Sequence, residues 1–444
     1  MFGDGRIVRD GDQLIPNEQG SVESALLVSV YQGSNNLKSC QEHLDELALL
    51  VKTYGMSVAD KQACPIRKFD ASTYLGKGKV EELIKTAQEL DVDRIIFDDE
   101  ISPAQQRNLE KLFSRRVMDR TELIIGVFAQ RAKTKEAHLQ IDLAELRYLA
   151  PRLKRMWTHL SRQAGTSGSG AGGAYLKGVG ETQIEIDRRI LKKKIEELNI
   201  EIAEVKSIRA TQRLSRQRSE IPIFAIVGYT NAGKSTLLNA LTDAGVFVED
   251  KLFATLDTTT RKFTLKNHQE ILLIDTVGFI RKLPHLLVAA FKSTLEESID
   301  ADILLHLIDA SHPQAEEQAQ ATHDLLKELG AENKPIIHVF NKIDKLTDPS
   351  ALIRLRMNHP KNVCISALTR EGFDELEQKM IEEISKQRKI VDLRIPQEDY
   401  AYVSEIRRLG KVLSQEYEEN DVILKADLPF LIANKFKSFI IPKQ

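Results

Sequence analysis

The sequence has few cysteines and no long apolar run. Its three cysteines, Cys40, Cys64 and Cys364, are odd in number, lie far apart and lack the spacing of metal ligands. We therefore expect them to be reduced and packed in the interior, and we assign them no chemistry. No apolar run approaches the roughly 18 residues that span a bilayer, and the start of the chain lacks the apolar core of a signal peptide. These absences predict a cytosolic protein.

The sequence also has little net charge, but its charge is unevenly placed. The 444 residues carry a formal charge of −2, with 42% hydrophobic and 29% charged residues. This composition is typical of a globular protein of roughly two to four domains and excludes a disordered chain. Between Arg147 and Arg218, sixteen Lys or Arg face seven Asp or Glu, a balance of +9 that leaves −11 for the remainder. The asymmetry predicts a polyanionic partner for the basic segment.

Short apolar runs alternate with helical patterns in the N-terminal part of the chain. Residues 24–31, 93–99 and 115–119 are typical of strands, and residues 41–55 and 78–91 of helices. This alternation predicts a small parallel α/β domain over residues 1–135. Gly76 and Gly78, with Lys77 and Lys79, stand at the start of the second helix, where backbone amides could hold a phosphate. Their spacing is not that of a nucleotide fingerprint, so an ordinary helix start is favoured.

Two heptad seams flank a glycine-rich segment, and they predict an antiparallel helical hairpin over residues 136–219. The seams are Leu139, Leu143, Leu146, Ala150, Leu153, Trp157 and Leu160 before the glycines, and Leu191, Ile195, Leu198, Ile202 and Val205 after them. Pro151 should kink the first helix or end its first part. Seven glycines between Gly165 and Gly180 form the tip, which is either a slack linker or a finger that orders against a partner.

Basic residues crowd both helices near this tip, where acidic residues become rare. A solvated helix face is the usual explanation for each residue alone, but it would normally place acidic residues at i,i+4. We therefore predict that the cluster binds the phosphates of a nucleic acid. The predicted RNA-binding residues are Arg152, Lys154, Arg155, Arg162, Lys177, Arg188, Arg189, Lys192 and Lys193.

Residues 221–240 read IPIFAIVGYTNAGKSTLLNA, an apolar strand followed by Gly-x-x-x-x-Gly-Lys-Ser and an amphipathic helix. Spacing and context match the phosphate-binding loop, whose backbone amides surround a β-phosphate. The Lys234 ammonium would bridge β- and γ-oxygens, and the Ser235 hydroxyl would be a ligand of Mg²⁺. The predicted contacts are Gly228, Tyr229, Thr230, Asn231, Ala232, Gly233, Lys234, Ser235 and Thr236.

Later segments, EILLIDTVGF, PIIHVFNKID and CISAL, complete a guanine nucleotide site. Asp275 can hold the magnesium ion through water, and the Gly278 amide can sense a γ-phosphate, which makes a hydrolysis-sensitive switch. The Asp344 carboxylate can accept from two N–H donors on one edge of guanine. Adenine presents no such pair, so we predict GTP rather than ATP. The predicted contacts are Asp275, Thr276, Val277, Gly278, Asn341, Lys342, Ile343, Asp344, Ser366, Ala367 and Leu368.

The segment LFATLDTTTR precedes Asp275 and is rich in threonine, as a first switch needs for a hydroxyl on Mg²⁺. Spacing alone leaves four candidates, Thr255, Thr258, Thr259 and Thr260. Phe279 stands where Ras-like enzymes have a glutamine that orients the attacking water. A phenyl ring can neither donate nor accept that hydrogen bond, and core packing is its simplest role. We therefore predict no catalytic side chain and slow intrinsic hydrolysis.

These segments resemble the HflX family of ribosome-associated GTPases over nearly the whole chain. STYLGKGKVEEL, DRTELIIGVFAQRA, LQIDLAELRYLAPRL, LSRQ and GETQIEIDRR are specific to the family, and GYTNAGKST, LFATLD, DTVGF and NKID in series identify the class of GTPase. The resemblance implies that Thr255 is the switch threonine and, with Ser235, a ligand of Mg²⁺. It also implies that the nucleotide is lined by Phe253, Ala254, Thr255, Leu256 and Asp257.

The resemblance further implies that the protein binds the large ribosomal subunit, with the hairpin tip reaching toward the peptidyl-transferase centre. We therefore expect the ribosome to accelerate the slow intrinsic hydrolysis. Members of the family are associated with splitting or rescuing stalled ribosomes, notably under heat stress. A flexible glycine loop on a basic stalk can pass between RNA strands where larger side chains would clash. The chain departs from the family pattern in its longer glycine loop and in Thr258, which replaces the usual proline and loosens the switch.

We thus expect an α/β protein, a monomer, that binds GTP or GDP with Mg²⁺. The N-terminal domain and hairpin precede a mostly parallel GTPase sheet with helices on both faces over residues 220–390, and a small α+β domain occupies residues 391–444. An alternative function is a GTP-dependent switch for a protein partner, with the hairpin as a coiled-coil docking site, but the +9 balance favours RNA. A further alternative makes the N-terminal domain a second nucleotide-binding or RNA-remodelling unit through Lys77 and Lys79.

Overall fold

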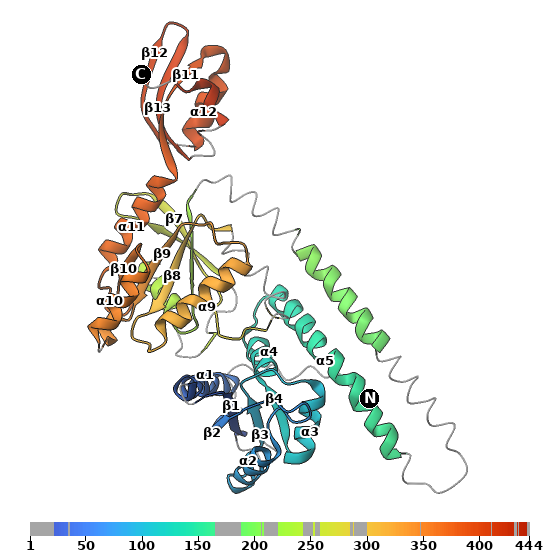
Figure 1. Ribbon diagram of the computed structural model, residues 1–444. Helices are drawn as coiled ribbons and strands as arrows, with labels where there is room; N and C mark the ends of the chain where they lie inside the picture. The colour runs from blue at the N-terminus through green and yellow to red at the C-terminus, as the bar shows by residue number, and fades with distance from the viewer. Residues whose placement is uncertain are drawn as a thin grey trace.

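The protein was studied as a computed structural model. It describes residues 22–33, 36–164, 188–205, 207, 221–242, 252–253, 258–284, 287, 300–346, 348–409, 411–429, 433 and 435–441. Three sheets, each with a core of its own, follow one another along the chain (Figure 1). None of the helices within the described ranges is long and apolar enough to cross a membrane.

The N-terminal sheet is parallel throughout, with strand order β2-β1-β3-β4. Its elements are β1 (Ser24–Tyr31), α1 (Leu37–Tyr54), β2 (Ser57–Pro65), α2 (Lys77–Glu89), β3 (Arg94–Phe97), α3 (Pro103–Phe113), β4 (Arg116–Asp119) and α4 (Arg120–Arg131). Successive strand residues point to opposite faces, so Leu27 packs with α1 and α4 while Leu26 packs with α2 and α3. The predicted parallel α/β arrangement is confirmed.

Two long helices follow, and they lie side by side. Helix α5 (Lys135–Ala164) packs along the helix of residues 188–205 through a cluster of Leu139, Leu143, Leu198 and Ile202 (Figure 1). The predicted heptad seam is therefore in contact along its first part. Helix α5 does not end at Pro151, because the helix continues through this residue. The glycine-rich tip, residues 165–187, lies outside the described residues.

The central sheet has six strands in the order β10-β9-β8-β5-β7-β6, and only β6 is antiparallel to its neighbour. Helices α7 and α11 pack on one face, and α9 and α10 lie on the other. The elements are β5 (Ile223–Gly228), α7 (Lys234–Thr242), β6 (Thr259–Thr264), β7 (Glu270–Asp275), β8 (Ile303–Asp309), α9 (Ala315–Glu328), β9 (Ile336–Asn341), α10 (Pro349–Asn358), β10 (Asn362–Cys364) and α11 (Phe373–Lys386). The predicted mostly parallel sheet with helices on both faces is confirmed.

The C-terminal sheet is small and antiparallel, with strand order β11-β13-β12. It consists of β11 (Arg388–Pro396), β12 (Lys411–Glu418) and β13 (Asp421–Pro429), and helix α12 (Tyr400–Leu409) covers one face. Strand β11 begins two residues after α11 ends, so this sheet extends directly from the last helix of the central one (Figure 1).

Candidate nucleotide-binding site

The loop between β5 and α7 requires glycine at both of its ends. Gly228 has φ +151°, and a Cβ there would lie 2.2 Å from the carbonyl oxygen of Leu307. Gly233 has φ +97°, and its Cβ would lie 2.4 Å from the side-chain nitrogen of Asn341. Any side chain at these positions would combine a strained backbone with a collision. The two glycines therefore let β8 and β9 approach the loop closely.

Lys234 begins helix α7 and is buried within the loop. Its Nζ donates to the carbonyl oxygens of Gly228 at 3.2 Å and Tyr229 at 2.8 Å. Burial lowers the pKa of Lys234 to about 8, against the opposing effect of Asp275. A buried ammonium at the start of a helix, beside the first backbone amides of that helix, makes a concentrated positive site suited to phosphate.

The end of β7 meets the start of α7. Ile226 of β5 pairs with Asp275 of β7, which carries the Asp275 carboxylate to the carboxyl edge of the sheet. The Ser235 hydroxyl donates to Asp275 Oδ2 at 2.7 Å, and the Thr276 hydroxyl donates to the carbonyl oxygen of Ile226 at 2.7 Å. Two residues predicted from separate motifs therefore share one hydrogen bond.

The residues after Asp275 are held to the phosphate-binding loop by backbone hydrogen bonds. The Thr230 amide donates to the Phe279 carbonyl at 2.7 Å, and the Phe279 amide donates to the Gly228 carbonyl at 3.0 Å. A Cβ at Gly278 would lie 2.9 Å from Lys234 Nζ. The Phe279 ring is 2% exposed and packs in a hydrophobic cluster, so it offers no hydrogen-bonding group to the site.

The two segments that are predicted to hold the base also meet the loop. Asn341 is buried; its side-chain amide donates to the Ala232 carbonyl at 2.8 Å, and its side-chain oxygen accepts from the Ala367 amide at 2.9 Å. Lys342, at φ +63°, donates from Nζ to the Asn231 carbonyl at 2.8 Å. One asparagine thus links the phosphate-binding loop to the segment of residues 366–368.

The remaining base-binding residues lie at the rim of this arrangement. Asp344 is exposed within the 3₁₀ turn Ile343–Lys345, and Leu368 is 74% exposed. The Ser366 hydroxyl accepts from the Thr369 amide at 3.1 Å, which shapes the loop from within. Asp309 is a further residue at this rim, which the sequence motifs do not indicate, and its carboxylate pairs with Lys342 Nζ at 2.7 Å. Its position at the end of β8, beside the end of β9, was the available signal.

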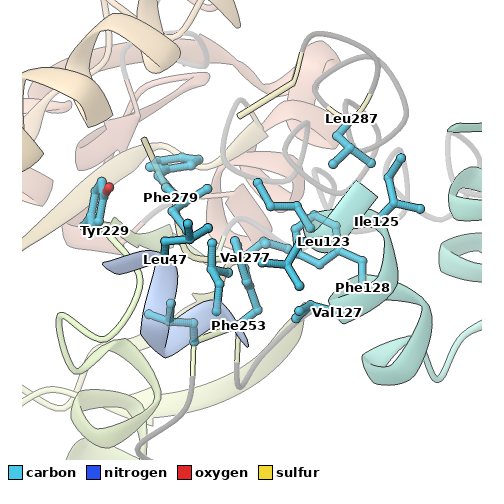
Figure 2. Close-up of a cluster of buried hydrophobic side chains, with 14 of the residues drawn as sticks. Leu47, Leu123, Ile125, Val127, Phe128, Tyr229, Phe253, Val277, Phe279 and Leu287 are labelled. Carbon is cyan, nitrogen blue, oxygen red and sulfur yellow. The ribbon is translucent and has the colours of Figure 1, made fainter. Parts of the chain in front are cut away.

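The first switch falls mostly outside the described residues. Ala254, Thr255, Leu256 and Asp257 lie there, so their predicted contacts, and the predicted role of Thr255 toward Mg²⁺, stay predictions. Phe253 is described and buried, and its ring lies 4.5 Å from that of Phe128 in α4, centroid to centroid (Figure 2). The switch therefore begins in contact with the N-terminal domain.

The prediction that Arg152 lies on an exposed basic face is wrong. Its guanidinium pairs with the fully buried Asp119 at 3.0 Å and donates to Gln106 and to the carbonyl oxygens of Ile101 and Tyr148. These bonds use four of the five N–H donors of the guanidinium, so Arg152 is engaged inside the protein and not on an exposed face. The charge pattern could not reveal this, because Asp119 is distant in sequence.

The other predicted RNA-binding residues divide into two groups. Those at the start of the second hairpin helix are exposed, namely Arg188, Arg189, Lys192 and Lys193. The side chains of Lys154, Arg155 and Arg162, and the whole of Lys177, lie outside the described residues.

Gly76 and Gly78 face open space at the start of α2, and Lys79 pairs with Glu82 within that helix.

Three family models match consecutive parts of the chain. A model described as "GTP-binding GTPase N-terminal" matches residues 41–129, and one described as "GTP-binding GTPase Middle Region" matches residues 131–216. A model described as "50S ribosome-binding GTPase" matches residues 223–342. The second of these covers the helical hairpin, and the third covers the phosphate-binding loop through Lys342.

Known proteins match the chain along most of its length. The "GTPase HflX" of Chlamydia pneumoniae is 47% identical over 427 residues, which cover 96% of this chain and 90% of that protein. The "GTPase HflX" of Escherichia coli K12 is 40% identical over 416 residues, covering 92% and 94%. Among solved structures, a GTP-binding protein from Sulfolobus solfataricus in complex with GDP is 26% identical, with 81% of this chain and 98% of that chain covered and a TM-score of 0.43.

Proposed function

The chain belongs to the HflX family of GTPases, and from this we propose that it hydrolyses GTP to GDP and phosphate while bound to the large ribosomal subunit, and that it splits or rescues stalled ribosomes. The observation that carries the proposal is the meeting of four motifs around one loop, in which Lys234, Asp275 and Asn341 each contact the loop or the helix that follows it. We further propose that it acts as a cytosolic monomer.

The nucleotide would be held by the loop and by the ends of three strands. The amides of residues 231–234 and the buried Lys234 ammonium would bind the phosphates. The exposed carboxylate of Asp344 would accept from the guanine N–H donors, and the segment of residues 366–368 would close over the base. This assignment is supported by the Asn341 side chain, which keeps the phosphate and base segments at a fixed separation.

The residues around Ser235 fit a magnesium ion. A hydroxyl and a carboxylate, 2.7 Å apart at Ser235 and Asp275, are the hard oxygen donors that Mg²⁺ prefers beside phosphate. Ser235 would be a direct ligand, and Asp275 would act through water. When bound, Mg²⁺ would neutralise charge on the phosphate oxygens.

Hydrolysis depends on positioning, because this chain supplies no glutamine after the Gly278 segment. The buried Phe279 ring keeps bulk water from that side of the loop but cannot orient a water molecule. The backbone of residues 278–279 is fixed to Gly228 and Thr230, so the Gly278 amide would sit ready to sense a γ-phosphate. We therefore propose a slow intrinsic reaction that the ribosome accelerates by reordering the switches or by adding a missing group.

The exposed cations of the hairpin would bind ribosomal RNA. Lys193 is 77% exposed and pairs only loosely, at 3.6 Å, with Glu197 one helical turn away. Lys192, Arg188 and Arg189 are also exposed. When such solvated cations neutralise phosphates, counterions that were condensed on the RNA are released, which makes RNA binding salt-dependent. In this proposal GTP orders both switches and favours the ribosome-bound form, and hydrolysis releases the protein.

Co-sedimentation with purified large subunits tests this proposal. We expect stronger binding with a non-hydrolysable GTP analogue than with GDP, a steep fall in affinity with salt, and acceleration of hydrolysis by the subunits. The double variant Lys192→Ala with Lys193→Ala should reduce the salt dependence, whereas Lys38→Ala with Lys85→Ala, at exposed sites on α1 and α2, should not. Binding that ignores salt and the hairpin lysines would favour the alternative function, a switch that docks a protein partner on the hairpin.

A further inference from the structure

The N-terminal domain packs directly on the nucleotide site. Leu47 of α1 and Leu123, Val127 and Phe128 of α4 share one hydrophobic cluster with Tyr229, Phe253, Val277 and Phe279 of the central domain (Figure 2). The central-domain members come from the phosphate-binding loop, the start of the first switch and the segment after Asp275. The N-terminal domain therefore covers the parts of a GTPase that respond to the nucleotide.

A single hydroxyl group joins the N-terminal domain, the phosphate-binding loop and the segment after Asp275. Tyr229, the second residue of the phosphate-binding loop, is 5% exposed. Its hydroxyl donates to the carboxylate of Glu46 in α1 and accepts from the backbone amide of Arg281 at 2.7 Å. Burial and the Glu46 carboxylate raise the pKa of Tyr229, so the hydroxyl stays protonated and keeps its donor. Removing this one oxygen would leave the partly buried Glu46 carboxylate and the Arg281 amide without a shared partner.

Arg120 fixes Glu46 in place. This arginine, the first residue of α4, is 2% exposed, and its guanidinium pairs with Glu46 and, at 2.8 Å, with Asp98. It also donates to the carbonyl oxygen of Arg281, from Nη2 at 3.0 Å and from Nε at 3.2 Å. One carboxylate oxygen of Glu46, Oε1, thus pairs with the Arg120 guanidinium, and the other, Oε2, accepts from the Tyr229 hydroxyl.

Asp98 completes the grip on Arg281. The Arg281 guanidinium donates to both carboxylate oxygens of Asp98, at 2.9 and 3.2 Å. Burial alone would raise the pKa of Asp98, but Arg120, Arg281 and Lys282 outweigh it and lower the pKa. The N-terminal domain therefore contacts Arg281 in two direct ways, because Arg120 binds its carbonyl and Asp98 binds its side chain. Its amide is bound indirectly, by the Tyr229 hydroxyl that Glu46 holds.

We propose that Glu46 is a positioning residue for the GTPase site: by holding the Tyr229 hydroxyl, it sets a shared position for the phosphate-binding loop and the segment of residues 278–281. Phe279 is hydrogen-bonded to Gly228 and Thr230, and Gly278 lies beside Lys234. A shift at Arg281 would therefore move the backbone at the position where a γ-phosphate would bind. GDP has no γ-phosphate to lie between the loop and this segment, so its affinity should depend little on their relative position. Because coupling is reciprocal, whatever moves α1 would also change the preference for GTP.

This inference rests on the GTPase activity of the family but not on the ribosome, so it is tested with the full chain alone. The variants are Glu46→Gln, Tyr229→Phe and their combination, with Asp45→Asn as the control, because Asp45 is the exposed neighbour on α1 and pairs with Lys61 of β2. Affinities for GDP and for a non-hydrolysable GTP analogue are measured by competition with a fluorescent nucleotide. Single-turnover hydrolysis and urea unfolding are measured alongside.

We expect each single variant to bind the GTP analogue at least fivefold more weakly, with GDP affinity within twofold, and to hydrolyse GTP at least fivefold more slowly. The combination should be no worse than either single change, because both break the same link. Asp45→Asn should match the wild type. Equal losses for GDP and the GTP analogue, or additive losses, would overturn the proposal in favour of a purely structural contact, as would wild-type behaviour of Tyr229→Phe. If Glu46→Gln does not fold, Tyr229→Phe alone decides, by its loss of affinity for the GTP analogue relative to its loss of affinity for GDP.

Discussion

Replacing Asn341 by alanine should weaken nucleotide binding, because one buried amide holds two loops. The substitution removes a donor to the Ala232 carbonyl and an acceptor for the Ala367 amide, and both of those residues are buried. A buried polar group without a partner costs about 1–3 kcal/mol. Two such groups lower the free energy of unfolding of the central domain by about 2–6 kcal/mol. If only about 1.4 kcal/mol of that is realised in the bound state, GDP binds tenfold more weakly.

Two assays and two further variants make this prediction sharp. Urea unfolding gives the free energy of unfolding, and titration with a fluorescent GDP gives the affinity. Asn341→Asp keeps the acceptor for Ala367 but places a carboxylate oxygen against the Ala232 carbonyl, so it should rescue neither value. Asn358→Ala removes the same chemical group from an exposed position on α10, where it contacts Glu316, and should change both values little. An Asn341→Ala protein with GDP affinity within twofold of the wild type would refute the reasoning.

Two other predictions concern buried charge. The folded-state pKa of His338 is lowered to about 4, first by burial and then by His359 and His323. Between pH 6.5 and 4 the unfolded state therefore binds more protons than the folded state, and the free energy of unfolding should fall as the pH drops, by about 2 kcal/mol at pH 5. Urea unfolding of His338→Gln should show a smaller loss over the same pH range. Arg152→Met should lower the free energy of unfolding by about 3–5 kcal/mol, because it removes the cation that pairs with the buried Asp119 carboxylate. Lys193→Met should change the free energy of unfolding by no more than about 0.5 kcal/mol, and the opposite ranking in urea unfolding would contradict the assignment.

Patterns of local sequence predicted much of the fold and of the phosphate-binding loop. The run SALLVSVY coincides with β1, and the glycine spacing placed the loop between β5 and α7. Strand β2 was not predicted, because SVADKQACP is an edge strand that mixes polar with small apolar residues, has no apolar run and fully buries only Cys64. Periodicity finds elements that bury one face, and an edge strand of this kind buries too little to be seen.

Partners that are distant in sequence could not be predicted. The basic residues of the hairpin look alike in the sequence, yet Arg152 is paired and Lys193 is solvated. The difference is made by Asp119, which reaches Arg152 only because β4 ends beside α5. Likewise, nothing near Glu46 marks it as a partner of Tyr229. Such contacts depend on how two finished domains pack, and a single sequence contains no periodic trace of that.

Two adjacent residues connect the hairpin to the nucleotide site. Asp119 caps helix α4 by accepting from the Glu122 amide at 2.8 Å, and it holds Arg152 of α5. Arg120, the next residue, holds the carbonyl of Arg281. The base of the hairpin and the segment after Phe279 are therefore separated by one peptide unit at the start of a helix. In the proposed function, RNA that displaced α5 would therefore act on Asp119 and, through the adjacent Arg120, on the backbone of Arg281 at the nucleotide site.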